Sequence, residues 1–388
     1  MKELSERTAG FTDSVIRRMT RVSNQYGAVN LSQGFPDFDP PKEITDRLAQ
    51  VACLGPHQYA LTWGAQNFRE ALAKKQEHFY GMKADPEKEI VVTCGSTEAM
   101  MASMMSVCNP GDKVVIFSPF YENYGADTIL SGAEPVYVPL KPPAFDFDGD
   151  ELENAVRQPG VKALILCNPS NPCGKVFTYE ELKVIAELAV KYDIYVITDE
   201  VYEHIVYKPN VHTCIATLPG MRERTIICNS LSKTYSITGW RLGIVIASPE
   251  IADRVKKVHD FLTVGAAAPL MEAAVVGLQF GDDYYRKLQA HYTHSKDLFI
   301  NGLENIGLNF TRPQGAYYVL VDISEFGYES DLVFCEDLAR KVGVGAVPGS
   351  SFFKEPENRY IRFHFAKQDA TLKEALERLA DIRIKMKK

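Results

Sequence analysis

The 388-residue sequence predicts an α/β protein with a mostly parallel seven-stranded sheet in a large domain and a second, smaller α/β domain. Short apolar runs alternate with helical stretches through the first two thirds of the chain, which is typical of a parallel sheet covered by helices on both faces. Polar residues directly follow several of these runs, where open α/β sheets place their ligands. The last third changes to longer charged helices around fewer strands.

Seven segments carry the apolar and β-branched composition of buried strands. They are Ile90–Thr93, Val114–Ser118, Pro135–Val138, Ala163–Cys167, Ile194–Thr198, Thr225–Cys228 and Gly243–Ala247. The apolar stretch from Val264 to Phe280 contains Pro269 and Glu272, so we expect a packed helix there instead of a membrane span. The smaller domain is predicted to contain helices at Tyr284–Leu303 and Leu372–Lys388 and strands near Ala316–Val321 and Tyr360–Phe365.

Composition excludes several classes of partner and compartment. The net charge of −7, without a block of Lys and Arg, argues against a nucleic acid or a membrane surface as partner. The N-terminus from Met1 to Arg7 is polar and charged and does not resemble a secretory signal. The eight cysteines lack C-x-x-C spacing, which favours reduced thiols. We therefore expect a cytoplasmic protein.

The segment from Asn229 to Gly243 is the most informative part of the chain, because it places a lysine among hydroxyls eight residues before an arginine. Lys233 follows an apolar strand and could form a Schiff base if its pKa is lowered. Ser230, Ser232 and Arg241 could bind a phosphate, since a guanidinium binds phosphate oxygens in a bidentate fork. Pyridoxal 5'-phosphate combines the required aldehyde and phosphate. A lysine taken by itself is more often a solvated loop residue.

The other groups that such a cofactor needs follow other predicted strands. Asp199 ends the strand Ile194–Thr198 and could keep a pyridine nitrogen protonated, while Tyr202 could reach the phenolic oxygen of the ring. Ser96 and Thr97 follow Gly95 at the start of a helix, where backbone N–H groups bind anions. Asn171 lies among two Asn-Pro pairs that hold its side chain at a strand end. Each of these residues alone would more often be an ordinary turn or cap residue.

Four other motifs do not support a competing site. Lys233-Thr234 imitates the end of a P-loop but lacks its glycines, and the glycines at 343, 345 and 349 do not have dinucleotide-fingerprint spacing. His291 and His294 are three residues apart on a predicted helix without obvious additional ligands, so surface histidines are favoured over a metal site. Met100, Met101, Met104 and Met105 are expected to pack in the core. We therefore expect no metal.

Taken together, these motifs resemble the class I pyridoxal-phosphate aminotransferases of fold type I, over nearly the whole chain. The resemblance implies a Schiff-base lysine at Lys233, a pyridinium partner at Asp199 and a phenolic-oxygen contact at Tyr202. It also implies further contacts to the cofactor or the substrate, which fall on Ser96, Thr97, Tyr121, Asn171, Ser230, Ser232, Arg241, Gly34 and Arg362. Arg362 would bind the α-carboxylate of the substrate, and Tyr59 would reach the phosphate of the neighbouring subunit in a homodimer.

The resemblance implies a large domain at residues 46–280 and a discontinuous small domain at 1–45 and 281–388. It implies ping-pong transfer of an amino group from an L-amino acid to a 2-oxo acid such as 2-oxoglutarate. Thr97 stands where some dicarboxylate-specific relatives have a lysine, and Phe35 and Phe38 lie in the substrate-lining strip, so aromatic or large apolar donors are favoured and aspartate is retained. A β-eliminating C–S lyase and a non-catalytic regulatory module remain alternatives.

Overall fold

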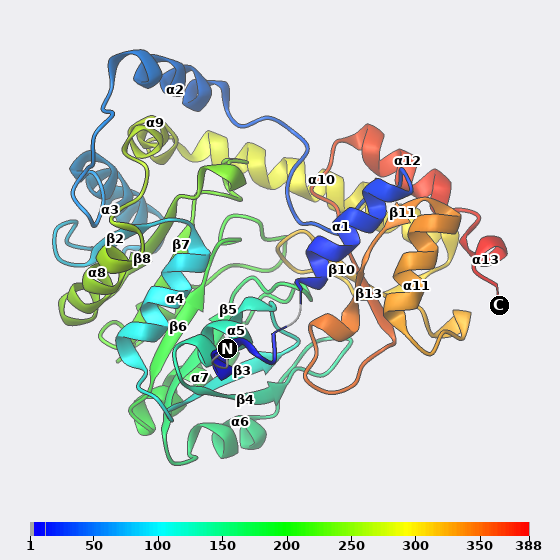
Figure 1. Cartoon of the computed structure of the whole chain (residues 1–388), viewed down its shortest axis with the longest axis horizontal. Coiled ribbons are helices and arrows are strands. Elements are labelled where there is room, and N and C mark those ends of the chain that lie inside the picture. The colour runs from blue at the N-terminus through cyan, green and yellow to red at the C-terminus, as the bar shows by residue number, and fades with distance from the viewer. Residues whose placement is uncertain (1–3, 12, 388) are drawn as a thin grey trace.

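A seven-stranded sheet forms the centre of the larger part of the molecule (Figure 1). The computed structural model describes residues 4–11 and 13–387. The strand order is β2-β8-β7-β6-β5-β3-β4. β8 is antiparallel to both neighbours and the other pairs are parallel, which confirms the predicted sheet. The strands are β2 (Ile90–Thr93), β3 (Lys113–Ser118), β4 (Glu134–Pro139), β5 (Val161–Cys167), β6 (Tyr195–Asp199), β7 (Thr225–Ser230) and β8 (Gly243–Ile246).

Alternate residues of the strands pack against helices on opposite faces of the sheet. Leu164 and Leu166 of β5 join one apolar cluster, and Ala163 and Ile165 join another, because successive side chains of a strand point to opposite faces. The helices of this part are α2 (Lys42–Leu54), α3 (Gln66–Tyr80), α4 (Ser96–Val107), α5 (Asn123–Leu130), α6 (Gly149–Val156), α7 (Tyr179–Lys191), α8 (Pro249–Thr263) and α9 (Ala268–Leu278). α9 confirms the packed helix expected between Val264 and Phe280.

The methionines of α4 divide between core and surface. Met100 and Met104 are buried against the sheet, as expected, whereas Met105 is exposed. The prediction of core packing was therefore wrong for Met105, because consecutive residues of a helix lie 100° apart and only one stripe faces the sheet.

The smaller part joins the two ends of the described chain. Its antiparallel sheet has the order β12-β13-β10-β9, and a separate parallel pair joins β1 to β11. The strands are β1 (Val29–Asn30), β9 (Asn309–Phe310), β10 (Tyr318–Asp322), β11 (Val344–Gly345), β12 (Val347–Pro348) and β13 (Tyr360–His364). The helices are α1 (Val15–Gln25), α10 (Asp282–Ile306), α11 (Asp331–Asp337), α12 (Asp369–Leu379) and α13 (Ile382–Lys385). The domain limits at 45/46 and 280/281 stay a prediction.

The predicted helix Leu372–Lys388 is two helices, and the chain breaks between α12 and α13. Leu379, Ile382 and Met386 are all buried, so the helical spacing of apolar residues continues across the break and conceals it in the sequence. Lys388, together with residues 1–3 and 12 of the predicted small domain and polar N-terminus, lies outside the described residues. Within the described ranges, none of the helices combines the length and apolar character of a membrane span.

Candidate active site

The residues predicted to carry the chemistry follow strands that end at one edge of the large sheet. β2, β3, β5, β6 and β7 run in the same direction, so their carboxyl ends lie together. Ser96, Tyr121, Asn171, Asp199 and Lys233 lie at or shortly after these ends.

Lys233 lies in the turn after β7, and its side chain is only partly exposed. Its Nζ donates a hydrogen bond of 3.1 Å to the backbone carbonyl oxygen of Gly34 and lies 5.9 Å from the centre of the Tyr317 ring. Burial lowers the pKa of Lys233 to about 8; the positive charges of Arg241 and Arg362 add to this, and the negative charge of Asp199 opposes it. The amine is thus far more nucleophilic near neutral pH than an ordinary lysine.

Asp199 ends β6 as a buried carboxylate. Its Oδ2 accepts a hydrogen bond of 2.7 Å from the hydroxyl of Tyr124, and its Oδ1 accepts one of 3.4 Å from the N–H of Val201. Burial raises the pKa of Asp199, while these hydrogen bonds and the charge of Lys233 favour the carboxylate. A basic ring nitrogen next to Asp199 would supply the counter-charge that this buried group lacks.

Tyr124 did not stand out in the sequence. It lies in the first turn of α5, three residues after Tyr121, and the two rings meet edge to face with centroids 5.8 Å apart. Tyr121 precedes the helix, and the N–H of Tyr124 donates to its carbonyl oxygen at 3.0 Å, which closes a turn between the two tyrosines. Their spacing of three residues was the signal in the sequence. Its bond to Asp199, 75 residues away, depends on how α5 packs on the sheet.

Tyr202 lies close to two further residues that the sequence analysis did not select. The hydroxyls of Tyr202 and Tyr318 are 2.8 Å apart, and the hydroxyl of Tyr317 donates to the carbonyl of Gly34 at 2.9 Å. A Cβ atom at Gly34 would lie 2.2 Å from the hydroxyl oxygen of Tyr318, so glycine is required for this close approach. Gly34 therefore connects the N-terminal strip to the amine of Lys233.

Arg362 is a fully buried cation in β13. Its Nη1 donates to Oδ1 of Asn171 at 2.7 Å, and its Nη2 donates to the carbonyl of Ser32 at 3.1 Å. In the described part of the chain its Nε has no hydrogen-bond partner and no carboxylate forms an ion pair with it. Burial lowers the pKa of Arg362. A buried guanidinium with only neutral acceptors fits an anionic ligand, because an unpaired buried charge is costly.

A second group of donors gathers around Gly95. α4 begins at Ser96 without a side-chain cap from any described residue, so the N–H groups of its first turn are available to an anion. A Cβ atom at Gly95 would lie 2.1 Å from Nη2 of Arg241, which shows how closely this guanidinium approaches the turn. Ser232 Oγ is buried and has no hydrogen-bond partner among the described residues. These groups fit a phosphate.

Tyr59 differs from the other predicted site residues because its side chain is exposed to solvent. The Tyr59 side chain is 86% exposed, so the single chain does not bring it to the cluster, and its role across an interface stays a prediction.

Phe38 packs edge to face on His291, with centroids 4.6 Å apart. His291 is therefore only partly exposed, whereas His294 is exposed and pairs with Asp369.

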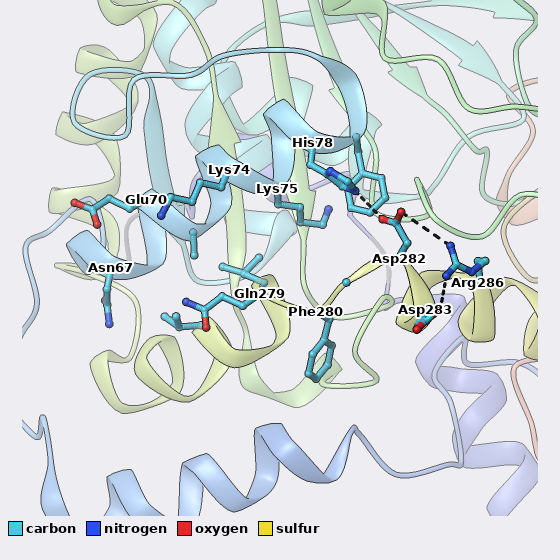
Figure 2. A pocket seen from close by; sticks show the side chains of 15 residues that line it. Asn67, Glu70, Lys74, Lys75, His78, Gln279, Phe280, Asp282, Asp283 and Arg286 are labelled. Carbon is cyan, nitrogen blue, oxygen red and sulfur yellow. Dashed lines mark hydrogen bonds and ion pairs between the residues drawn. The ribbon is translucent and has the colours of Figure 1, made fainter.

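A separate cavity of about 680 Å³ lies between α3 and the junction of α9 and α10 (Figure 2). His78 pairs with Asp282, which is also within 4.0 Å of Arg286, and Arg286 pairs with Asp283. None of the predicted site residues lines this cavity. Because these charges neutralise one another, the cavity offers weaker anion binding than the group around Arg362 and Arg241.

The geometry agrees with comparisons to known proteins. Residues 26–379 match the family described as aminotransferase class I and II. Methionine aminotransferase from Escherichia coli is 35% identical over 95% of this chain and 96% of its own length, and human kynurenine–oxoglutarate transaminase 3 is 33% identical over 96% and 89%. The structure of N-succinyldiaminopimelate aminotransferase from Mycobacterium tuberculosis superposes with a TM-score of 0.94 at 35% identity, covering 97% of this chain and 99% of that one.

The chain therefore belongs to the class I and II aminotransferase family. It is an enzyme of fold type I that uses pyridoxal phosphate to transfer amino groups. The relatives named above are all aminotransferases, which supports transamination over the lyase and regulatory alternatives.

Proposed function

We propose that this transaminase takes an aromatic or large apolar L-amino acid as donor and a 2-oxo acid such as 2-oxoglutarate as acceptor. The observation that carries this proposal is the position of Phe35, an exposed aromatic ring that directly follows Gly34, whose carbonyl accepts the hydrogen bond from Lys233 Nζ. The Phe35 ring gives this strip an aromatic surface, with Lys367 Nζ 4.8 Å from its centroid, and an aromatic surface suits an apolar side chain. The likeness to a methionine and a kynurenine transaminase supports the same class.

The cofactor would be held by the residues that the sequence singled out. Ser96, Thr97, Ser230, Ser232 and Arg241 would surround its phosphate, and the unpartnered hydroxyl of Ser232 and the uncapped start of α4 support this placement. Asp199 would face the ring nitrogen. Tyr202 and Asn171 would approach the phenolic oxygen, and Tyr121 would stack on the ring. When bound, pyridoxal phosphate supplies an aldehyde for the amine and a ring that accepts electrons from Cα.

The protein residues would bind and orient the substrate and move its proton. Arg362 would pair with the α-carboxylate of the substrate while remaining fixed by Asn171 and Ser32. Lys233, whose pKa is about 8, would take the proton from Cα as a general base and return it as a general acid. Asp199, oriented by Tyr124, would keep the ring nitrogen protonated. Because one product must leave before the second substrate enters, kinetics would be ping-pong.

We also propose a homodimer in which Tyr59 reaches the phosphate of the partner. Two segments with exposed apolar side chains support an interface: one contains Tyr59 and Leu61, and the other contains Phe261, Leu262 and Val264. They lie side by side, because Thr62 donates to Asp260 at 3.4 Å. A cytoplasmic location is proposed as well, since each of the eight cysteines is a free thiol.

A donor panel tests the substrate class. Purified enzyme is given 2-oxoglutarate with kynurenine, phenylalanine, methionine, leucine or aspartate, and both products are measured. We expect kcat/KM for the aromatic and large apolar donors to exceed that for aspartate by about tenfold or more, because contact with the Phe35 ring stabilises an apolar side chain. A preference for aspartate, or release of ammonia without an acceptor, would contradict the proposal.

A further inference from the structure

His259 is a buried histidine whose two ring nitrogens both contact acceptors. It lies in α8, one turn before the final residue Thr263, and its side chain has no exposed surface. Nδ1 lies 2.7 Å from Oε1 of Glu98 and 3.2 Å from Oγ1 of Thr263, and Nε2 lies 3.0 Å from the backbone carbonyl oxygen of Thr62. A carbonyl can only accept a hydrogen bond, so Nε2 carries a hydrogen.

Glu98 is the carboxylate that decides the state of the second nitrogen. Its Oε1 also accepts from the hydroxyl of Thr263 at 2.9 Å, and its Oε2 accepts from the N–H of Cys94. Burial alone would raise the pKa of Glu98, but the hydrogen bonds from His259, Cys94 and Thr263 outweigh it and lower the pKa. At 2.7 Å, Nδ1 of His259 and Oε1 of Glu98 need a hydrogen between them, because two bare acceptors would repel each other. Glu98 already accepts from Cys94 and Thr263, which favours a hydrogen on Nδ1 and therefore an imidazolium ring.

This ion pair is attached to the turn that would hold the phosphate. Glu98 lies in the first turn of α4, and its carboxylate accepts a hydrogen bond from the N–H of Cys94, which directly precedes Gly95. This bond fixes the turn around Gly95. Gly95 has φ +88° and lies against Arg241. A small displacement of Glu98 would therefore move the N–H groups at the start of α4 and the guanidinium of Arg241, which are the donors proposed for the phosphate.

His259 also contacts the two exposed segments that are proposed to form the interface with the partner subunit. Thr62 follows Tyr59 and Leu61 in one exposed segment, and Thr263 precedes Val264 in the other. The thiol of Cys94 contacts the carbonyl of Gly265 at 3.7 Å, which adds a second connection to that segment. Val264 has φ +67°, a strained conformation for a β-branched residue that persists only when its surroundings impose it.

We propose that His259 is a positioning residue which, as an imidazolium, couples the phosphate turn of its own subunit to the two exposed segments that the partner covers. The coupling rests on the proposed dimer. One ring contacts the phosphate turn through Glu98 and the exposed face through Thr62. Binding of the cofactor and association of the subunits should therefore support each other.

Two substitutions separate the two hydrogen bonds of the ring. The amide nitrogen of asparagine can take the place of Nδ1, and that of the longer glutamine can take the place of Nε2. His259→Gln should lose the bond to Glu98 and raise the dissociation constant of pyridoxal phosphate by roughly tenfold or more, since a hydrogen bond to a charged group is lost. His259→Asn should keep cofactor affinity within about threefold and instead raise the dimer dissociation constant by a similar factor.

The protonation state of the His259 ring can be measured by NMR. In enzyme labelled with ¹⁵N-histidine, the His259 resonances are assigned by their absence in His259→Gln. We expect two protonated ring nitrogens, both with and without cofactor. A resonance pair typical of a neutral ring would overturn the inference. Glu98→Gln should change the His259 signal to that of a neutral ring and weaken cofactor retention to the same extent as His259→Gln.

His294→Gln is the matched control, because His294 also pairs with a carboxylate, that of Asp369, but on the exposed surface of the smaller part. It should change neither dissociation constant. Equal losses of cofactor affinity and of dimer affinity in both His259 variants would indicate a merely structural role and overturn the inference. A monomeric wild-type enzyme would overturn the proposed dimer and the coupling together, whereas a dimer in which both variants behave like His294→Gln would overturn the inference alone.

Discussion

The hydroxyl of Tyr124 donates a hydrogen bond of 2.7 Å to Oδ2 of Asp199 inside the sheet edge. The bond fixes the carboxylate that would face the ring nitrogen of the cofactor, and it favours the ionised form against the effect of burial. Tyr124 thus acts on the proposed chemistry through Asp199.

Tyr124→Phe should lower kcat by about tenfold or more while leaving KM for the amino acid nearly unchanged. The reason is that a hydrogen bond to a carboxylate contributes ~1.5–3 kcal/mol, and its loss here weakens the charge that holds the ring proton. Steady-state kinetics of the variant measure the effect. Tyr192→Phe is the control, because Tyr192 also donates to a carboxylate, Glu153, at 2.6 Å. A drop in melting temperature without a change in kcat would show that Tyr124 serves stability only.

Lys233→Ala should remove covalent attachment of the cofactor and nearly all turnover. The wild-type enzyme should be yellow, with an absorbance band that shifts when an amino acid is added, because the Lys233 amine conjugates with the aldehyde. Absorbance spectra and activity of the purified proteins test both statements. Normal turnover in Lys233→Ala would refute the assignment of this residue.

The reaction of the cofactor-free enzyme with pyridoxal should accelerate as the pH rises through about 8, because the neutral form of Lys233 is the nucleophile. Pyridoxal lacks the phosphate, so binding at Arg241 does not obscure the titration. Arg241→Gln should move the midpoint upward, since it removes a positive charge that lowers the pKa of Lys233. Stopped-flow absorbance across a pH series gives the midpoint, and a flat profile would contradict the prediction.

The lowered pKa of Lys233 also affects the stability of the cofactor-free enzyme. The pKa of Lys233 is lower in the folded protein than in the unfolded chain, so between about pH 8 and the unfolded value of ~10.4 the unfolded chain binds more protons. Lys233 therefore destabilises the cofactor-free enzyme below this window, and its penalty disappears as the pH rises through it. Denaturant unfolding of wild type and Lys233→Met should show a stability difference that narrows with increasing pH. A difference that stays constant would contradict the shift.

Arg362→Lys should raise KM for the amino donor by about 10- to 100-fold and affect kcat less. Lysine retains the charge but cannot form the planar fork that binds a carboxylate bidentately and Asn171 at the same time. Initial rates over a range of donor concentrations measure the change. Arg359→Lys is the control, because the exposed guanidinium of Arg359 lies over the Tyr360 ring and pairs with the partly buried carboxylate of Glu357.

Tyr59→Phe should weaken cofactor retention in the partner's site, because a phenol that donates to a charged acceptor contributes ~1.5–3 kcal/mol. Subunits that carry both Tyr59→Phe and Lys233→Ala are mixed with wild-type subunits. In the heterodimers the sites with a wild-type lysine should lose cofactor faster than in a mixture made with Lys233→Ala alone. Equal retention in the two mixtures would show that Tyr59 does not act across the interface.

The sequence by itself determined the large sheet and its reactive edge. Buried strands require short apolar runs, and each run from β2 to β8 was recognisable from its own residues. Asp199 ends one of these runs and Lys233 lies shortly after another, and parallel strands bring such positions to a common edge. Local pattern and the rule for parallel sheets were sufficient for these predictions, because neither depends on which distant side chains meet.

Only the tertiary structure decided which partners hold these residues. The bonds Tyr124–Asp199, Tyr202–Tyr318 and His259–Glu98 join residues 75, 116 and 161 positions apart. The break between α12 and α13 was equally hidden, because the apolar spacing continues across it. The local sequence determines the face of a helix or strand on which a side chain lies. The identity of its partner depends on how separate elements pack. Burial of apolar surface is non-directional, so the polar contacts are determined only by the final arrangement.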